Sequence, residues 1–103
     1  MSELIFCYVP VPDRETGKAL LTSALHLQLA ACGNLWGPMT SFYEWEGRHM
    51  EETEFVMLLK TPLHKQEALE AHIQKEHPYE CPCIARFPVD ANEGFAAWVH
   101  QQV

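Results

Sequence analysis

"SFYEWEGRHMEETEFVMLLK", residues 41–60, has the pattern of two β-strands joined by a turn. Its first part alternates between faces and places Tyr43 and Trp45 on the same side of a strand. Its last part, residues 55–60, is almost entirely apolar and predicts a buried strand. Residues 46–52 contain a glycine and several charges, which favours a hairpin turn with an extended loop.

The chain before this hairpin predicts a strand followed by a helix. Residues 4–11 form a short, apolar, β-rich run that is typical of a buried strand. Asp13 is suited to cap the helix that follows, because its carboxylate can accept a hydrogen bond from the first turn. The apolar spacing predicts that this helix covers residues 14–31, and Gly33 then supplies an exit.

The chain after the hairpin predicts a second helix and a last strand. Thr61 is a candidate N-cap and Pro62 a candidate first helical residue, so we expect a helix over residues 63–77. Pro78 stops it, because proline lacks a backbone donor and restricts the residue before it. Residues 81–89 predict a strand, and the prolines near its ends favour an edge position in the sheet.

Residues 92–103 complete the pattern with a final helix. The order β-α-β-β-α-β, with two β-α-β halves joined by a hairpin, predicts an α+β fold of the ferredoxin-like type, a βαββαβ sandwich with a C-terminal helix. The sheet should be antiparallel, with the two earlier helices on one face. We expect one domain over residues 1–103, because the chain shows no linker or repeat.

The composition of the chain limits the partners that the protein is expected to bind and indicates its cellular compartment. Apolar residues make up 48% of the 103, and seven Lys and Arg stand against fourteen Asp and Glu. The formal net charge of −7 repels phosphate backbones, so we expect no nucleic-acid partner. The start of the chain lacks the features of a secretory signal, and its longest uncharged stretch contains polar residues. We therefore expect a cytoplasmic protein with no membrane partner and with reduced thiols.

The segment "HPYECPC", residues 77–83, contains candidate ligands for a soft metal. If it is extended, Cys81 and Cys83 point to the same side, and His77 can add a nitrogen. Thiolate and imidazole suit copper or zinc. The alternative is that both cysteines are small strand residues at a subunit contact. The default for Cys7 and Cys32 is a buried thiol that behaves as a small apolar side chain, although this topology can bring Cys7 near the pair.

Six blocks, in order across almost the whole chain, make the sequence similar to the divalent cation tolerance protein family CutA. They are PDRETGKAL, LAACGNL, SFYEWEG, LLKT, HPYECPCIARFPV and AAWV. The resemblance implies a ferredoxin-like domain that assembles as a tight homotrimer. It also implies a link to tolerance of copper and other heavy metals, with copper as the possible cofactor.

The residues suggested as copper ligands in this family are only partly retained here. His77 matches the second of two adjacent histidines, and Glu76 replaces the first. The first-strand cysteine of the family falls on Val9, while Cys7 lies two residues earlier on the same strand face. Cys83 stands where a glutamate is usual. The candidate metal ligands are His77, Cys81, Cys83, Glu76 and Cys7.

A second set of residues also matches family positions and predicts an inter-subunit pocket. It consists of Tyr43, Trp45, Lys60, Tyr79 and Trp98. Large amphipathic rings favour interfaces and pockets, and trimer packing is the alternative role for the whole set. The sequence shows no phosphate loop or nucleophile elbow, so we expect no enzyme. A trimeric signalling or assembly scaffold with a small-molecule pocket between subunits is the alternative to a metal-tolerance protein.

Overall fold

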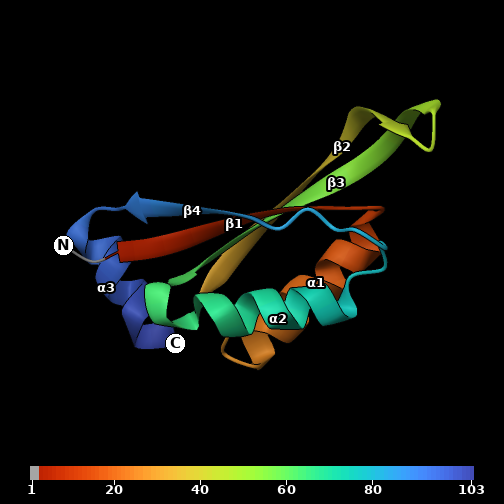
Figure 1. Ribbon diagram of the computed structural model, residues 1–103. Helices are drawn as coiled ribbons and strands as arrows, with labels where there is room; N and C mark the ends of the chain where they lie inside the picture. The colour runs from red at the N-terminus through yellow and green to blue at the C-terminus, as the bar shows by residue number, and fades with distance from the viewer. Residues whose placement is uncertain (1–2) are drawn as a thin grey trace.

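The computed structural model describes residues 3–103 as a four-stranded antiparallel sheet with three α-helices (Figure 1). The elements are β1 (Glu3–Val11), α1 (Arg14–His26), β2 (Cys32–Trp45), β3 (Arg48–Pro62), a 3-10 turn (Leu63–Lys65), α2 (Gln66–Glu76), β4 (Ala85–Asp90) and α3 (Glu93–Gln102). This order confirms the predicted α+β, ferredoxin-like fold with a C-terminal helix.

The sheet has the strand order β2-β3-β1-β4, so β1 is central and pairs antiparallel with both β3 and β4. The last strand lies at the edge, as its prolines predicted. Pro88, which has no N–H to donate, stands opposite Ile5 in this edge strand. The other edge is β2, which pairs only with β3.

Two apolar clusters hold the layers together. Alternate residues of β1, among them Ile5, Cys7 and Val9, are buried against α1 and α2. Leu4 points to the opposite face and is buried with Ala96 and Val99 of α3. Each large apolar side chain buried in this way contributes roughly 1.5–3 kcal/mol relative to exposure. Figure 1 shows α1 and α2 on one side of the sheet and α3 at the end where β1 begins.

The β2–β3 hairpin is much longer than the sequence predicted. The extended loop expected over residues 46–52 is wrong, because β3 already begins at Arg48. The turn consists of Glu46 and Gly47, with φ values of 51° and 78°. Both values are positive, which is the geometry of the type I′ turn that matches the twist of the paired strands. The hairpin therefore projects as a ribbon beyond the helices (Figure 1).

The first helix is shorter than predicted. α1 ends at His26 and not at residue 31, because the chain reverses at Gln28, whose φ is 59°. The residues that follow bond to the sheet and not to the helix. The Ala31 N–H donates a hydrogen bond of 2.9 Å to the carbonyl of Lys60 in β3.

The predicted start of the second helix is also wrong. Thr61 caps no helix but is a buried strand residue, and its hydroxyl donates to the carbonyl of Leu29 over 2.7 Å. Pro62 is the last residue of β3. The α-helix begins only at Gln66, after the 3-10 turn, and it has no side-chain cap.

The last strand begins later than predicted, at Ala85 instead of Cys81. Residues 77–84 are irregular backbone between α2 and β4. Cys81 and Cys83 therefore lie on a connecting segment, so strand alternation cannot be used to place their side chains.

Candidate functional site

His77 fixes the segment between α2 and β4 to the sheet. Its side chain is buried, and Nε2 lies 2.8 Å from the carbonyl oxygen of Pro10 on β1. Its Nδ1 accepts a hydrogen bond from the backbone N–H of Tyr79 over 3.1 Å. Since a carbonyl can only accept and an amide N–H can only donate, the proton sits on Nε2 and the ring is neutral. Both ring nitrogens are therefore engaged with backbone.

Tyr79 ties the same segment to the hairpin. Its ring centroid lies 4.7 Å from that of His77, and its hydroxyl donates to Oε2 of Glu54 on β3 over 2.6 Å. Burial raises the pKa of the Tyr79 phenol, and the hydrogen bond and negative charge of Glu54 raise it further. Consequently, the phenol stays protonated and acts as a donor. His77 and Tyr79 together position the residues that follow them.

A pocket of about 400 Å³ forms where this segment meets one face of the hairpin. Tyr43 and Met50 stand opposite each other in the β2–β3 pairing, and Trp45 lies on the same face. The lining residues are Pro10, Tyr43, Trp45, Met50, Glu54, Tyr79, Glu80, Cys81 and Cys83. The pocket therefore combines aromatic walls, two exposed thiols, a thioether and two carboxyl groups.

The candidate metal ligands are not all gathered in this pocket. Cys81 and Cys83 line it, whereas His77, Glu76 and Cys7 are not among its lining residues. Glu76 is exposed at the end of α2. Within residues 3–103 of a single chain, no three His, Cys, Asp or Glu side chains are placed to hold one metal ion.

Cys7 lies in the core between the sheet and the helices, apart from the thiol pair. Burial raises the pKa of its thiol to about 11; the negative charge of Glu70 adds to the rise and the Arg86 charge opposes it. The default assignment of Cys7 as a small buried side chain is confirmed. Cys32 is half-buried, and desolvation raises its pKa as well.

The five residues predicted to line an inter-subunit pocket lie in two separate parts of the structure. Tyr43, Trp45 and Tyr79 line the pocket at the hairpin, which lies within a single chain. Their grouping in a pocket between subunits stays a prediction. Lys60 lies elsewhere, with Nζ 5.2 Å from the ring centroid of Phe6 and 5.7 Å from that of Phe95. Trp98 joins this other group by stacking on Phe95, with centroids 6.0 Å apart. A single chain therefore does not unite the five residues.

Met50 and Glu54 line the pocket, but the sequence pattern predicted neither of them as a site residue. Met50 lies within the loop expected over residues 46–52, and Glu54 lies two residues after it. Given the two-residue turn at Glu46 and Gly47, strand pairing places Met50 directly opposite Tyr43. A two-residue turn at these positions would have predicted from the sequence that Met50 lies beside Tyr43.

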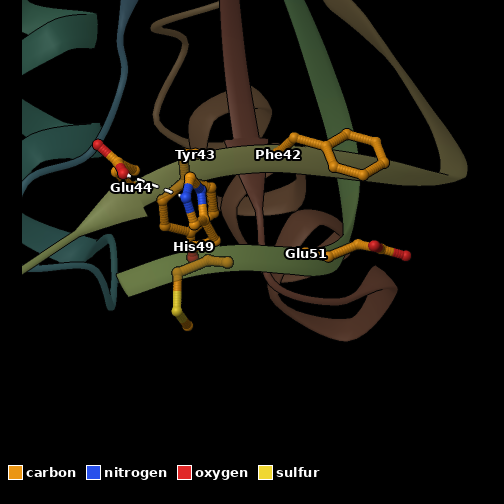
Figure 2. Close-up of a pocket in the computed structure, with 6 residues that line it drawn as sticks. Phe42, Tyr43, Glu44, His49 and Glu51 are labelled. Carbon is orange, nitrogen blue, oxygen red and sulfur yellow. Dashed lines mark ion pairs between the residues drawn. The ribbon is translucent and has the colours of Figure 1, made fainter. Parts of the chain in front are cut away.

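A second hollow lies at the tip of the hairpin (Figure 2). It is lined by Phe42, Tyr43, Glu44, His49, Met50 and Glu51. His49 and Glu44 form an ion pair of 3.5 Å, but their side chains are 91% and 64% exposed. An ion pair so open to water contributes roughly 0–1 kcal/mol. Figure 2 shows this pair on one side of the hollow and Phe42 and Glu51 on the other, so its polar groups do not converge on a ligand.

The helices of the described chain, residues 3–103, include none with the length and apolar character needed to span a bilayer.

Comparison with known proteins shows the family to which this chain belongs. A model of the CutA1 divalent ion tolerance protein family matches residues 5–102. The divalent-cation tolerance protein CutA of Archaeoglobus fulgidus is 32% identical over 95% of this chain and 96% of its own length. The crystal structure of the divalent ion tolerance protein CutA1 from Ehrlichia chaffeensis superposes with a TM-score of 0.94 at 31% identity, covering 99% of this chain and 96% of that one.

Other relatives are longer than this chain. The chloroplastic CutA of Arabidopsis thaliana is 34% identical over 92% of this chain, which spans only 53% of that protein. The match nevertheless covers almost all of the sequence described above. This chain belongs to the CutA1 divalent ion tolerance protein family.

Proposed function

We propose that this protein contributes to metal-cation tolerance in the cytoplasm by binding copper, or a similar soft metal, as a homotrimer. The observation that supports metal binding best is the pocket that contains both Cys81 and Cys83. Both thiols are free and exposed, and thiolates prefer soft ions such as Cu(I). Family membership supplies the link to divalent cations.

The unpaired surfaces of a single chain support the proposed trimer. The projecting hairpin exposes large apolar side chains, including Trp36, Phe42 and Trp45. The outer edge of β2 has no strand beside it within residues 3–103, and open edges of this length are usually paired or covered. A closed threefold arrangement would cover the hairpins and satisfy three such edges at once.

The proposed partners are other copies of this chain and metal ions. We propose neither a nucleic-acid nor a membrane partner, in keeping with the net charge of −7. We also propose no enzymatic activity. In the pocket, the Tyr79 hydroxyl and the Glu54 carboxylate are bonded to each other, so these two groups serve a structural role.

A scaffold with a small-molecule pocket is the second candidate. The aromatic side chains of Tyr43, Trp45 and Tyr79 favour it, because ligand pockets are commonly lined by rings with a few polar groups. In this case the pocket would take an organic ligand in preference to a metal.

A binding panel separates the two candidates. The purified protein is titrated with Cu(I), Cu(II) and Zn(II), with Mg(II) as a hard-ion control, and in parallel with nucleotides and small anions. The metal-tolerance proposal predicts saturable binding of a soft metal and no binding of Mg(II). Binding of a nucleotide or anion, with no binding of any soft metal, would instead support the scaffold.

A further inference from the structure

We propose that the pocket binds Cu(I) through three sulfur atoms, those of Cys81, Cys83 and Met50. This inference rests on the proposed function and names the metal, its oxidation state and its ligands. It replaces a ligand set that includes His77 with one that consists only of thiolates and a thioether.

The three sulfur-containing side chains line the same pocket. Cys81 and Cys83 come from the segment before β4, and Met50 comes from β3. Met50 is held in place by its pairing with Tyr43 across the hairpin. No three His, Cys, Asp or Glu side chains within residues 3–103 of one chain are placed to hold a metal, so a third ligand from the same chain has to be of another kind. A methionine thioether is such a ligand, and it selects Cu(I).

His77 is not available as a ligand in the folded chain. Its Nε2 donates to Pro10, and its Nδ1 accepts from the N–H of Tyr79. Neither nitrogen has a free lone pair to offer. Coordination would leave the Pro10 carbonyl or the Tyr79 amide without its hydrogen-bond partner, which is unfavourable for a buried polar group. The imidazole therefore shapes the pocket without contacting the ion.

The aromatic walls of the pocket also affect which ion it can hold. The rings of Tyr43, Trp45 and Tyr79 line the pocket beside the sulfur atoms. The ring faces offer no oxygen ligand of the kind that hard ions such as Mg(II) require. Glu54 is occupied by the Tyr79 hydroxyl, so a hard carboxylate that would favour other ions is tied up on that side.

Binding is a ligand exchange in which the copper keeps its oxidation state. Cu(I) forms bonds to the two thiolate sulfurs and to the thioether, and the two thiols release two protons to the solvent. Cu(I) and its three sulfur ligands together carry one net negative charge, because two thiolates outweigh one monovalent cation.

An anaerobic competition titration against a chromogenic Cu(I) chelator tests the proposal on the whole chain. We expect one Cu(I) per chain for the wild type. The double variant Cys81→Ser, Cys83→Ser should lose at least about tenfold in Cu(I) affinity, roughly 1.4 kcal/mol. Met50→Leu, which preserves volume but removes the sulfur, should lose a smaller factor, on the order of threefold to tenfold.

Two matched variants serve as controls. Cys32→Ser removes a thiol outside the pocket, and Met39→Leu removes a thioether that is not among its lining residues. Both should bind Cu(I) like the wild type. The circular dichroism of every variant is compared with that of the wild type to verify folding.

A second measurement needs no variant. Cu(I) should protect Cys81 and Cys83 from alkylation, as read by peptide mass spectrometry, and should leave the rate at Cys32 unchanged. Unchanged Cu(I) affinity in the double cysteine variant, or absence of protection in the wild type, overturns the proposed site while the proposed function still stands. Loss in the cysteine variant with full affinity in Met50→Leu overturns the three-sulfur set. If the wild type binds no soft metal, the proposed function itself fails.

Discussion

At the scale of single residues, the environment of each cysteine decides what it can do. Cys7 faces the core, Cys32 is half-buried, and Cys81 and Cys83 are exposed in the pocket. The sequence predicted the buried character of Cys7, because it lies in an apolar strand. It could not predict that Cys7 is separated from the pair, since this depends on the irregular path of residues 77–84.

Alkylation of the native protein should follow this order of exposure. We expect Cys81 and Cys83 to react first, and Cys7 to remain unmodified until the chain unfolds. The reasons are its full burial and its pKa of about 11, which keeps the thiolate scarce at neutral pH. Timed labelling with iodoacetamide and peptide mass spectrometry provides the measurement. Modification of Cys7 in the folded protein at the rate of Cys81 would contradict its placement in the core.

Tyr79 predicts a defined effect at alkaline pH. Its pKa is raised in the folded chain above the ordinary value of 10.0, by burial and by Glu54. A group of this kind contributes stability that is fully present below the unfolded pKa and is lost as the pH rises above it. Ultraviolet titration should therefore show one phenol that ionises later than free tyrosine, and Tyr79→Phe should abolish this late component. A late component that persists in Tyr79→Phe would show that another tyrosine is responsible.

At the scale of secondary structure, the order of elements could be predicted but several boundaries could not. The apolar runs and the helical spacing gave the correct β-α-β-β-α-β order. The errors occur where tertiary pairing overrides local preference. Thr61 resembles a helix cap, yet its hydroxyl bonds to Leu29 and its backbone extends β3. Likewise, the charged residues after Gly47 resemble a loop, yet they form a solvent-exposed ribbon.

The hairpin turn gives a test at this scale. Glu46 and Gly47 both have positive φ, and a Cβ on Gly47 would meet no atom within 4 Å. Gly47→Ala should therefore destabilise the protein only through backbone strain, by roughly 1 kcal/mol, whereas Glu46→Asn should stabilise it by a few tenths of that. Urea unfolding monitored by circular dichroism measures both changes. Equal stability of the wild type and Gly47→Ala would argue against the type I′ turn.

At the scale of the whole molecule, a single chain leaves large apolar side chains of its hairpin exposed. This long hairpin extends away from the body formed by the helices and the rest of the sheet (Figure 1). It exposes the aromatic side chains of Trp36, Phe42, Tyr43 and Trp45. Lys60 and Trp98 lie apart from Tyr43, Trp45 and Tyr79 within one chain. The sequence resemblance groups these five residues in a pocket between subunits. If that grouping is correct, assembly has to bring the two places together.

Native mass spectrometry of the wild-type protein, loaded anaerobically with Cu(I), tests the central claim of a metal-binding trimer most directly. We predict a species with the mass of three chains that carries one Cu(I) per chain. Trp45→Ala, which removes a half-exposed ring from the hairpin, should shift the population toward single chains at the same concentration. A wild-type protein with the mass of one chain and no bound copper would contradict the account.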